Sequence, residues 1–227
     1  MKENITAIVL AAGQGKRMNS KIQKQFLLLQ NKPVLYYSLH CFQESDVNRI
    51  VLVTGESEIE YCYKEIVIKY GFNKVSDIVA GGVERYDSVE HGLNCIDDGI
   101  VLIHDGARPF VTQEMIQRSI ATAKKEGACT VGMPVKDTIK IVDENGYGID
   151  TPARKMLWQI QTPQTFQVSL IKEAYYRMRQ SENGNITDDT MLVERYCGTK
   201  VKVIEGDYRN IKITTPEDMI LAESFLK

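Results

Sequence analysis

Short runs of apolar and β-branched residues recur along the chain and alternate with longer amphipathic stretches. Each run is unbroken rather than alternating, which is typical of parallel strands whose two faces are both buried. The pattern predicts strands at residues 6–10, 49–53, 76–79, 100–104 and 130–134. Helices are expected between them at residues 33–42, 56–70, 85–96 and 112–125. Elements in this order predict a Rossmann-like α/β fold, with a mostly parallel sheet and helices on both faces.

The periodicity changes after Pro134. Residues 137–143 alternate between polar and apolar, Glu144-Asn145-Gly146 offers a turn, and residues 147–151 lead away from it. This pattern predicts a protruding β-hairpin, and such a hairpin is only marginally stable alone in water. We therefore expect a single domain over residues 1–227 in which residues 137–157 form a dimerisation arm, and hence a homodimer.

The α/β pattern returns near the C-terminus, where a helix is expected near residues 188–197 and a strand at 200–204. A last helix is expected from Thr215, because Thr-x-x-Asp is the sequence of a capping box. Ile211 and Ile213 flank Lys212 in the alternation of a strand, so a solvent-facing lysine is the plain alternative to a functional one.

Composition narrows the class of protein. The formal net charge is −2, whereas nucleic-acid-binding proteins normally carry a basic excess, so no nucleic-acid partner is expected. No apolar run approaches the length that spans a bilayer, so no membrane segment is expected either. The five cysteines are widely spaced and lack a C-x-x-C pair. Reduced, idle thiols in a cytoplasmic protein are the simplest interpretation.

A glycine-rich turn follows the first predicted strand, with Gly13 and Gly15 in the segment Ala11–Met18. Such a turn lets backbone N–H groups approach a phosphate closely. The dinucleotide fingerprint fails because Met18 occupies its third glycine position, and the Walker A loop fails because Leu10 and Arg17 occupy required positions. A tight turn beside a solvated basic face is the alternative. The basic residues nearby favour an anion site: Lys16, Arg17, Lys21 and Lys24.

Several separated segments together resemble one known group of enzymes. They are Ala11–Met18, Lys24-Gln25-Phe26, Gly81–Arg85 with Ser88-Val89, His104–Pro109, Val135–Thr138, Leu157-Trp158, Gln161–Gln164, Thr187–Asp189 and Asn210–Thr214. The chain is similar to nucleotidyltransferases of the glycosyltransferase-A-like (GT-A-like) fold, and most closely resembles the 2-C-methyl-D-erythritol 4-phosphate cytidylyltransferases. The resemblance implies transfer of CMP from CTP to 2-C-methyl-D-erythritol 4-phosphate, with release of pyrophosphate, in non-mevalonate isoprenoid synthesis.

The resemblance also assigns roles to residues of this sequence. Catalytic roles fall on Lys24, Lys212 and Arg17, with the two lysines on either side of the α-phosphate. Nucleotide contacts are implied for Ala11, Ala12, Gly13, Gly15, Gly82, Ser88, Asp105 and Gly106. Contacts with the polyol phosphate are implied for Arg108, Thr138, Arg154, Thr162 and Thr187, with Thr138 and Arg154 reaching across from the other subunit. A divalent cation, Mg²⁺, is implied as cofactor, and Asp105 would approach it directly or through water.

Some residues allow a structural interpretation beside the functional one. Asp105 ends an apolar strand, and ligands of open α/β sheets bind at that edge, so the functional interpretation is favoured there. His104 is expected to be a packed, hydrogen-bonded histidine, and Trp158 is expected to lie in the core. Two positions depart from the family pattern. Gln23 stands where relatives commonly have proline, which predicts a less rigid loop at Lys24, and Gly106 stands where alanine is usual.

Three other functions compete with this assignment. Ribitol 5-phosphate cytidylyltransferase is the nearest, and Thr151, Arg154 and Leu157-Trp158 favour the methylerythritol enzyme over it. A non-catalytic nucleotide-binding module of the same fold is disfavoured by the presence of Lys24, Lys212 and Asp105. A dinucleotide-dependent dehydrogenase is disfavoured by Met18.

Overall fold

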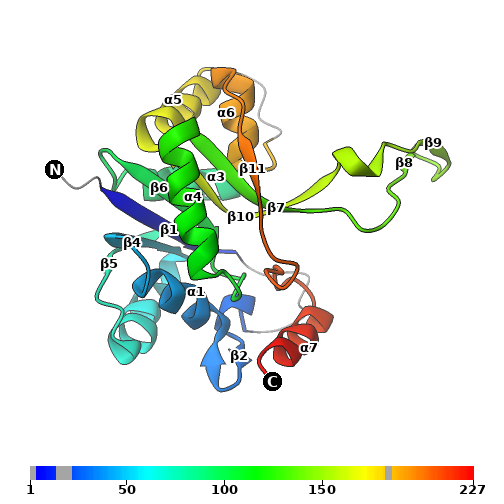
Figure 1. Cartoon of the computed structure of the whole chain (residues 1–227). Coiled ribbons are helices and arrows are strands. Elements are labelled where there is room, and N and C mark those ends of the chain that lie inside the picture. The colour runs from blue at the N-terminus through cyan, green and yellow to red at the C-terminus, as the bar shows by residue number, and fades with distance from the viewer. Residues whose placement is uncertain (1–3, 14–21, 182–185) are drawn as a thin grey trace.

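A computed structural model describes residues 4–13, 22–181 and 186–227 of the chain. A seven-stranded sheet runs through the molecule in the order β11-β7-β10-β6-β1-β4-β5 (Figure 1). All neighbouring pairs are parallel except those that involve β10, which runs antiparallel to both β6 and β7. The strands are β1 (Ile5–Ala11), β4 (Arg49–Thr54), β5 (Val75–Ala80), β6 (Ile100–Asp105), β7 (Ala128–Pro134), β10 (Trp158–Gln167) and β11 (Lys202–Glu205).

Helices cover both faces of this sheet, as the sequence pattern predicts. One face packs against α1 (Val34–Gln43) and α4 (Gln113–Glu126), and the other against α3 (Arg85–Leu93), α5 (Val168–Arg179) and α6 (Asp189–Cys197). Strand β1 shows why its sequence is unbroken: Ala7 and Val9 belong to one core cluster, whereas Ile8 belongs to the other. The last helix, α7 (Pro216–Phe225), packs with the short strand β2 (Leu28–Leu29) in a third cluster, and β2 pairs with β3 (Lys32–Pro33).

Capping residues set several helix starts. The Thr112 hydroxyl accepts a hydrogen bond from the Met115 N–H at the start of α4, and the Asp188 carboxylate does the same for Met191 in α6. Thr215 and Asp218 form the expected capping box of α7. The five strands and the helices predicted ahead of the hairpin are confirmed, with ends that differ by up to three residues.

The segment predicted as one helix over residues 56–70 is wound unevenly. It begins as a 3-10 helix, η3 (Glu56–Glu58), continues as α2 (Ile59–Tyr61) and then becomes a π-helix, η4 (Cys62–Ile68). The alternation of Ile211, Lys212 and Ile213 is that of a strand, but residues 211–213 form no strand. Their alternation reflects instead a loop with Ile213 packed into the third cluster.

The predicted hairpin extends away from the body of the molecule (Figure 1). It contains β8 (Ile141–Val142), β9 (Gly148–Asp150) and the 3-10 turn η5 (Arg154–Met156), with Gly146 in a positive-φ turn at its tip. Trp158, expected in the core, begins β10 at the root of this hairpin and is 38% exposed. The expectation is wrong because the first residues of β10 project beyond the helices that cover the sheet. Among the described residues, no helix is long and apolar enough to cross a bilayer.

Candidate active site

A cavity of about 730 Å³ opens at the carboxyl ends of β1 and β6. These strands are parallel neighbours, and their register sets Leu10 beside Asp105. The end of β1 supplies the glycine turn, whereas the end of β6 supplies the carboxylate. The cavity is lined by Leu10, Ala11, Ala12, Gly13, Lys24, Gln25, Gly82, Val83, Glu84, Arg85, Ser88, Asp105, Ala107 and Lys212.

One wall of the cavity joins the glycine turn to the start of α3. A Cβ atom on Gly81 would lie 2.4 Å from the Ala12 Cβ, so the two backbone segments approach closely only because Gly81 lacks a side chain. The Gly82 N–H donates to the Ser88 Oγ at 3.0 Å, and the Ser88 hydroxyl donates to the Glu84 carbonyl. Ala12, Gly82 and Ser88, which are expected to contact the nucleotide, therefore lie together.

The buried Asp105 carboxylate holds three cationic side chains. Lys212 Nζ lies 2.9 Å and Arg108 Nε 3.5 Å from its Oδ2, and Arg85 Nε lies 3.6 Å from its Oδ1. Burial alone would raise the pKa of Asp105, but the charges of Lys212, Arg85 and Arg108 hold that pKa well below its usual range. The carboxylate is therefore ionised throughout the physiological range, and the cluster keeps a net positive charge.

Arg85 is a residue of the site for which the sequence predicts no role, although it ends the motif Gly81–Arg85. Its guanidinium lies 2.8 Å from Asp189, a fully buried carboxylate at the start of α6, and the Tyr175 hydroxyl donates to the same carboxylate at 2.8 Å. Arg85 thus links the cavity to α5 and α6. The Gly-Gly-Val-Glu-Arg segment was the available signal, because an arginine so close to paired glycines suits an anion site.

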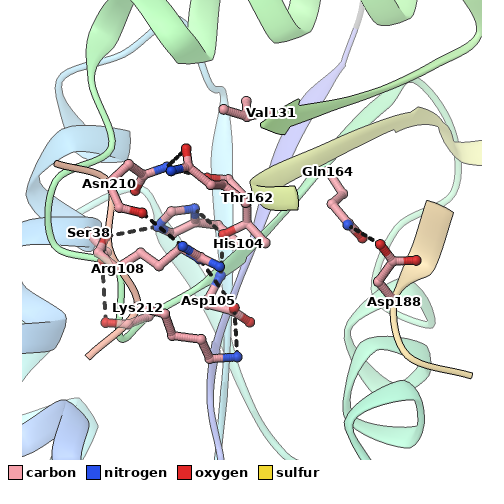
Figure 2. A network of polar contacts seen from close by, with 12 residues as sticks. Ser38, His104, Asp105, Arg108, Val131, Thr162, Gln164, Asp188, Asn210 and Lys212 are labelled. Atoms are coloured by element: carbon pink, nitrogen blue, oxygen red, sulfur yellow. Dashed lines mark hydrogen bonds and ion pairs between the residues drawn. The ribbon is translucent and has the colours of Figure 1, made fainter. Parts of the chain in front are cut away.

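His104 and Thr162 form a directed hydrogen-bond chain behind Asp105 (Figure 2). The Arg108 carbonyl can only accept, so His104 Nε2 carries the proton and donates to it at 3.1 Å. His104 Nδ1 then accepts from the Thr162 hydroxyl at 2.9 Å, and Thr162 Oγ1 accepts the Asp105 N–H at 3.1 Å. His104 is fully buried, as expected of a packed histidine. The one hydroxyl proton of Thr162 is thus donated to His104. The contact of Thr162 with a polyol phosphate stays a prediction.

Asn210 ties the loop that carries Lys212 to the sheet (Figure 2). Its side-chain amide donates to the backbone carbonyl of Thr162 at 2.9 Å, and the backbone carbonyl of Asn210 accepts from the Arg108 guanidinium at 2.8 Å. The Ile213 N–H donates to the Ala107 carbonyl, which fixes the loop on the other side of Lys212. Asn210 is fully buried. It stands in the Asn210–Thr214 motif, but its role could not be predicted because the sequence does not distinguish an asparagine that braces a loop from one in a turn.

The remaining predicted residues lie in different places. Arg108 pairs with Asp105 in the cationic cluster. Gly106 is buried and does not line the cavity, whereas its neighbour Ala107 does. Thr187 is exposed just before α6, and Thr138 and Arg154 lie on the hairpin, where Arg154 donates to the Lys136 carbonyl. Gly15 and Arg17 lie outside the described residues.

The described residues contain no group of three or more His, Cys, Asp or Glu side chains that could cage a metal ion. Glu84 and Asp105 are the acidic residues that line the cavity, and Asp105 already pairs with three cations. This donor set does not build a closed metal site, although it suits an ion that arrives with phosphate oxygens.

A glycine turn, a cationic cluster and a further lysine, Lys24, share one cavity at the carboxyl edge of a mostly parallel sheet, an arrangement expected of a nucleotidyltransferase. Comparison with known families matches residues 5–227 to IspD, 2-C-methyl-D-erythritol 4-phosphate cytidylyltransferase. The chain belongs to this family and is a cytidylyltransferase of isoprenoid biosynthesis.

Individual relatives agree over almost the whole chain. The 2-C-methyl-D-erythritol 4-phosphate cytidylyltransferase of Alkaliphilus oremlandii is 51% identical, covering 99% of this chain and 97% of that one. The enzyme of the same name from Lachnospira eligens is 52% identical, covering 98% and 99%. A crystal structure of 4-diphosphocytidyl-2C-methyl-D-erythritol synthase from Anaerococcus prevotii superposes with a TM-score of 0.85 at 35% identity, covering 99% and 98%. These matches favour the methylerythritol enzyme over the ribitol 5-phosphate enzyme and confirm the resemblance seen in the sequence.

The buried His104 predicts a pH-dependent stability. Burial lowers its pKa to about 4, whereas an unfolded histidine has a pKa of about 6.5, so the unfolded state takes up a proton first as the pH falls. The stability that the neutral, buried His104 contributes is therefore complete above about pH 6.5 and is lost as the pH falls towards 4. The total loss is about 3 kcal/mol in the free energy of unfolding. Urea unfolding across this range measures the slope. His104→Gln should lose that part of the slope, and an equal slope in both proteins would contradict the assignment.

Proposed function

We propose that the chain transfers CMP from CTP to 2-C-methyl-D-erythritol 4-phosphate through the combined charges of Lys24 and Lys212. The observation that carries this proposal is that these two lysines, distant in the sequence, line one cavity beside the glycine turn. Arg17 is proposed to act with them, as part of the segment that follows Gly13. The backbone of Ala11, Ala12 and Gly13, with Gly82 and Ser88, is proposed to hold the nucleoside, and Gly15 the triphosphate.

The chemistry requires charge neutralisation more than proton transfer. A phosphate oxygen of the polyol attacks the α-phosphorus of CTP, the bond to the β-phosphate oxygen breaks, and pyrophosphate leaves with that electron pair. The nucleophile is already an anion near neutral pH, so no general base is needed. Two unit charges about 4 Å apart repel by roughly 4 kcal/mol at an effective dielectric constant near 20, and the lysines offset such repulsion.

Asp105 gives Lys212 a defined position before the substrates arrive. The Lys212 ammonium is held 2.9 Å from the carboxylate, and the Arg108 guanidinium is held beside it. An ammonium that is already placed loses less conformational entropy when it binds a phosphate. Arg108, Thr162 and Thr187 are proposed to lie toward the polyol phosphate from this side of the cavity.

We further propose that a divalent cation, Mg²⁺, accompanies the triphosphate. Mg²⁺ keeps several waters and binds through few protein carboxylates together with phosphate oxygens. This fits a cavity whose acidic lining residues are Glu84 and the ionised Asp105. When bound, the ion would neutralise phosphate charge, with Asp105 approaching it through water.

The hairpin over residues 137–157 is proposed to be a dimerisation arm. It exposes large apolar side chains, and a cluster of this kind on a projecting hairpin favours a protein partner. The exposed apolar residues are Ile139, Ile141, Val142, Tyr147, Ile149 and Met156, with Trp158 at the root. We propose that the partner is a second copy, whose Thr138 and Arg154 complete the polyol phosphate site.

The five free thiols fit a cytoplasmic setting.

Lys24→Ala and Lys212→Ala should each lower kcat by about 100-fold or more, because each removes a cation that the transition state needs. Steady-state kinetics with circular dichroism separates this loss from unfolding. Lys202→Ala, on the exposed side of β11, is the matched control and should leave kcat unchanged. Wild-type turnover in either cavity variant would remove that lysine from the mechanism.

Substrate choice is tested by pyrophosphate release. We expect turnover with CTP and 2-C-methyl-D-erythritol 4-phosphate, at least about tenfold weaker turnover with ribitol 5-phosphate, and little with UTP or ATP. Activity should vanish when a chelator removes divalent cations and return with Mg²⁺. Equal use of ribitol 5-phosphate would overturn the proposed substrate.

The shared site is tested by complementation. Arg154→Ala should mainly raise KM for the polyol phosphate, because Arg154 is proposed to contact that substrate in the partner's site and is not among the residues that line the chain's own cavity. At a polyol phosphate concentration below the raised KM, co-expressed Arg154→Ala and Lys212→Ala subunits should turn over faster than either variant alone, since one site of a mixed dimer is intact. A fully active monomer would contradict the proposal.

A further inference from the structure

The turn that carries Lys24 is braced by a chain of side-chain hydrogen bonds. Lys24 opens the 3-10 turn η2 (Lys24–Phe26), directly after Gln23. The Gln25 side-chain amide donates both to the Ala11 carbonyl, in the glycine turn, and to Gln23 Oε1 at 2.6 Å. The Gln23 amide in turn donates to Glu58 Oε1 at 2.8 Å. The chain therefore runs from Glu58 through Gln23 and Gln25 to Ala11, past both sides of Lys24.

The direction of this chain is fixed at its two ends. The Glu58 carboxylate and the Ala11 carbonyl can only accept, so Gln25 must donate twice and Gln23 must accept from one side and donate to the other. Gln25 is 1% exposed, so an unmade hydrogen bond there would leave a buried amide without a partner. The arrangement leaves little freedom for either glutamine and for the lysine between them.

Glu58 is itself held in place at the end of the chain. Its other carboxylate oxygen fits against Gly55, where a Cβ atom would lie only 1.9 Å away, and the Ser57 hydroxyl donates to its Oε1. The same segment contacts the Lys24 turn a second time, because the Tyr61 and Phe26 rings pack edge to face with their centroids 5.1 Å apart. The segment that follows β4 thus packs against the Lys24 turn and supports it.

We infer that Glu58 and Gln23 are positioning residues that hold the Lys24 ammonium against the α-phosphate. Neither residue touches the substrates in this proposal; both act through the backbone of η2. The inference rests on the catalytic role proposed above for Lys24. It also reverses the expectation of a less rigid loop, because hydrogen bonds now fix the residue that precedes Lys24.

Gln23 offers a sharp test, because its φ of −62° is the value that a proline imposes. Gln23→Ala should lower kcat about tenfold, since a small misplacement of a catalytic group has effects of this size or larger. Gln23→Pro should recover most of that loss, because the ring fixes φ without the hydrogen bonds. KM for CTP and the thermal midpoint Tm should change little in both.

Glu58→Ala should lower kcat as Gln23→Ala does, and the double variant should be no worse than either single variant. In the Gln23→Pro background, Glu58→Ala should have no further effect. Glu56→Ala removes an exposed carboxylate from the same turn without breaking the chain, so its kcat should match the wild type. Additive losses, or an equal loss with Glu56→Ala, would overturn the inference.

Lys24→Ala separates this inference from the proposed function. If Lys24→Ala is inactive while Gln23→Ala and Glu58→Ala turn over at the wild-type rate, only the positioning role falls. If Lys24→Ala itself turns over at the wild-type rate, the catalytic role of Lys24 falls, and the positioning role falls with it.

Discussion

The attraction between one buried carboxylate and three cationic side chains organises this molecule. Arg85, Arg108 and Lys212 come from separate parts of the chain, and without Asp105 their like charges would drive them apart. With it they gather at one sheet edge and still leave an excess of positive charge. The site can therefore be assembled before any phosphate is present, and it remains attractive to one.

The surroundings of Asp105 serve this arrangement. The parallel register of β1 and β6 sets the carboxylate beside the glycine turn, and α3 begins where Arg85 can reach it. Behind it, His104 and Thr162 hold its backbone N–H, while Asn210 joins the Arg108 and Lys212 segments to β10. These contacts are buried, so water does not compete for them. Neutral partners thus fix the positions of Asp105 and Arg108, and the carboxylates of Asp105 and Asp189 fix Arg85 and Lys212 in turn.

Sequence reasoning reaches the fold because buried parallel strands leave an unbroken apolar signature, as in residues 5–11 and 100–105. It also reaches the glycine turn, Lys24, Asp105 and Lys212, because each stands in a short motif. It fails where three-dimensional packing overrides local pattern. The alternation around Lys212 came from a loop whose Ile213 is buried and whose Ile211 is partly buried in the same cluster, rather than from a strand. Trp158 is exposed because the start of β10 extends beyond the helices that cover the sheet. Gln25 and Asn210 stand in such motifs but their bracing roles could not be predicted, and Glu58 gave no signal, since the partners of all three lie far away in sequence.

Strand β10 carries the hairpin at one end and Thr162 near its middle, and its pairing with β7 shifts between Ile160 and Gln164. Side chains alternate along a strand, so one added residue between Trp158 and Thr162 would turn the threonine away from His104 and pull Gln161 off the loop at Asp207. The tip of the hairpin around Gly146 is exposed and touches none of these groups. Natural insertions and deletions in this protein should therefore accumulate at the tip, while the length of the root stays constant.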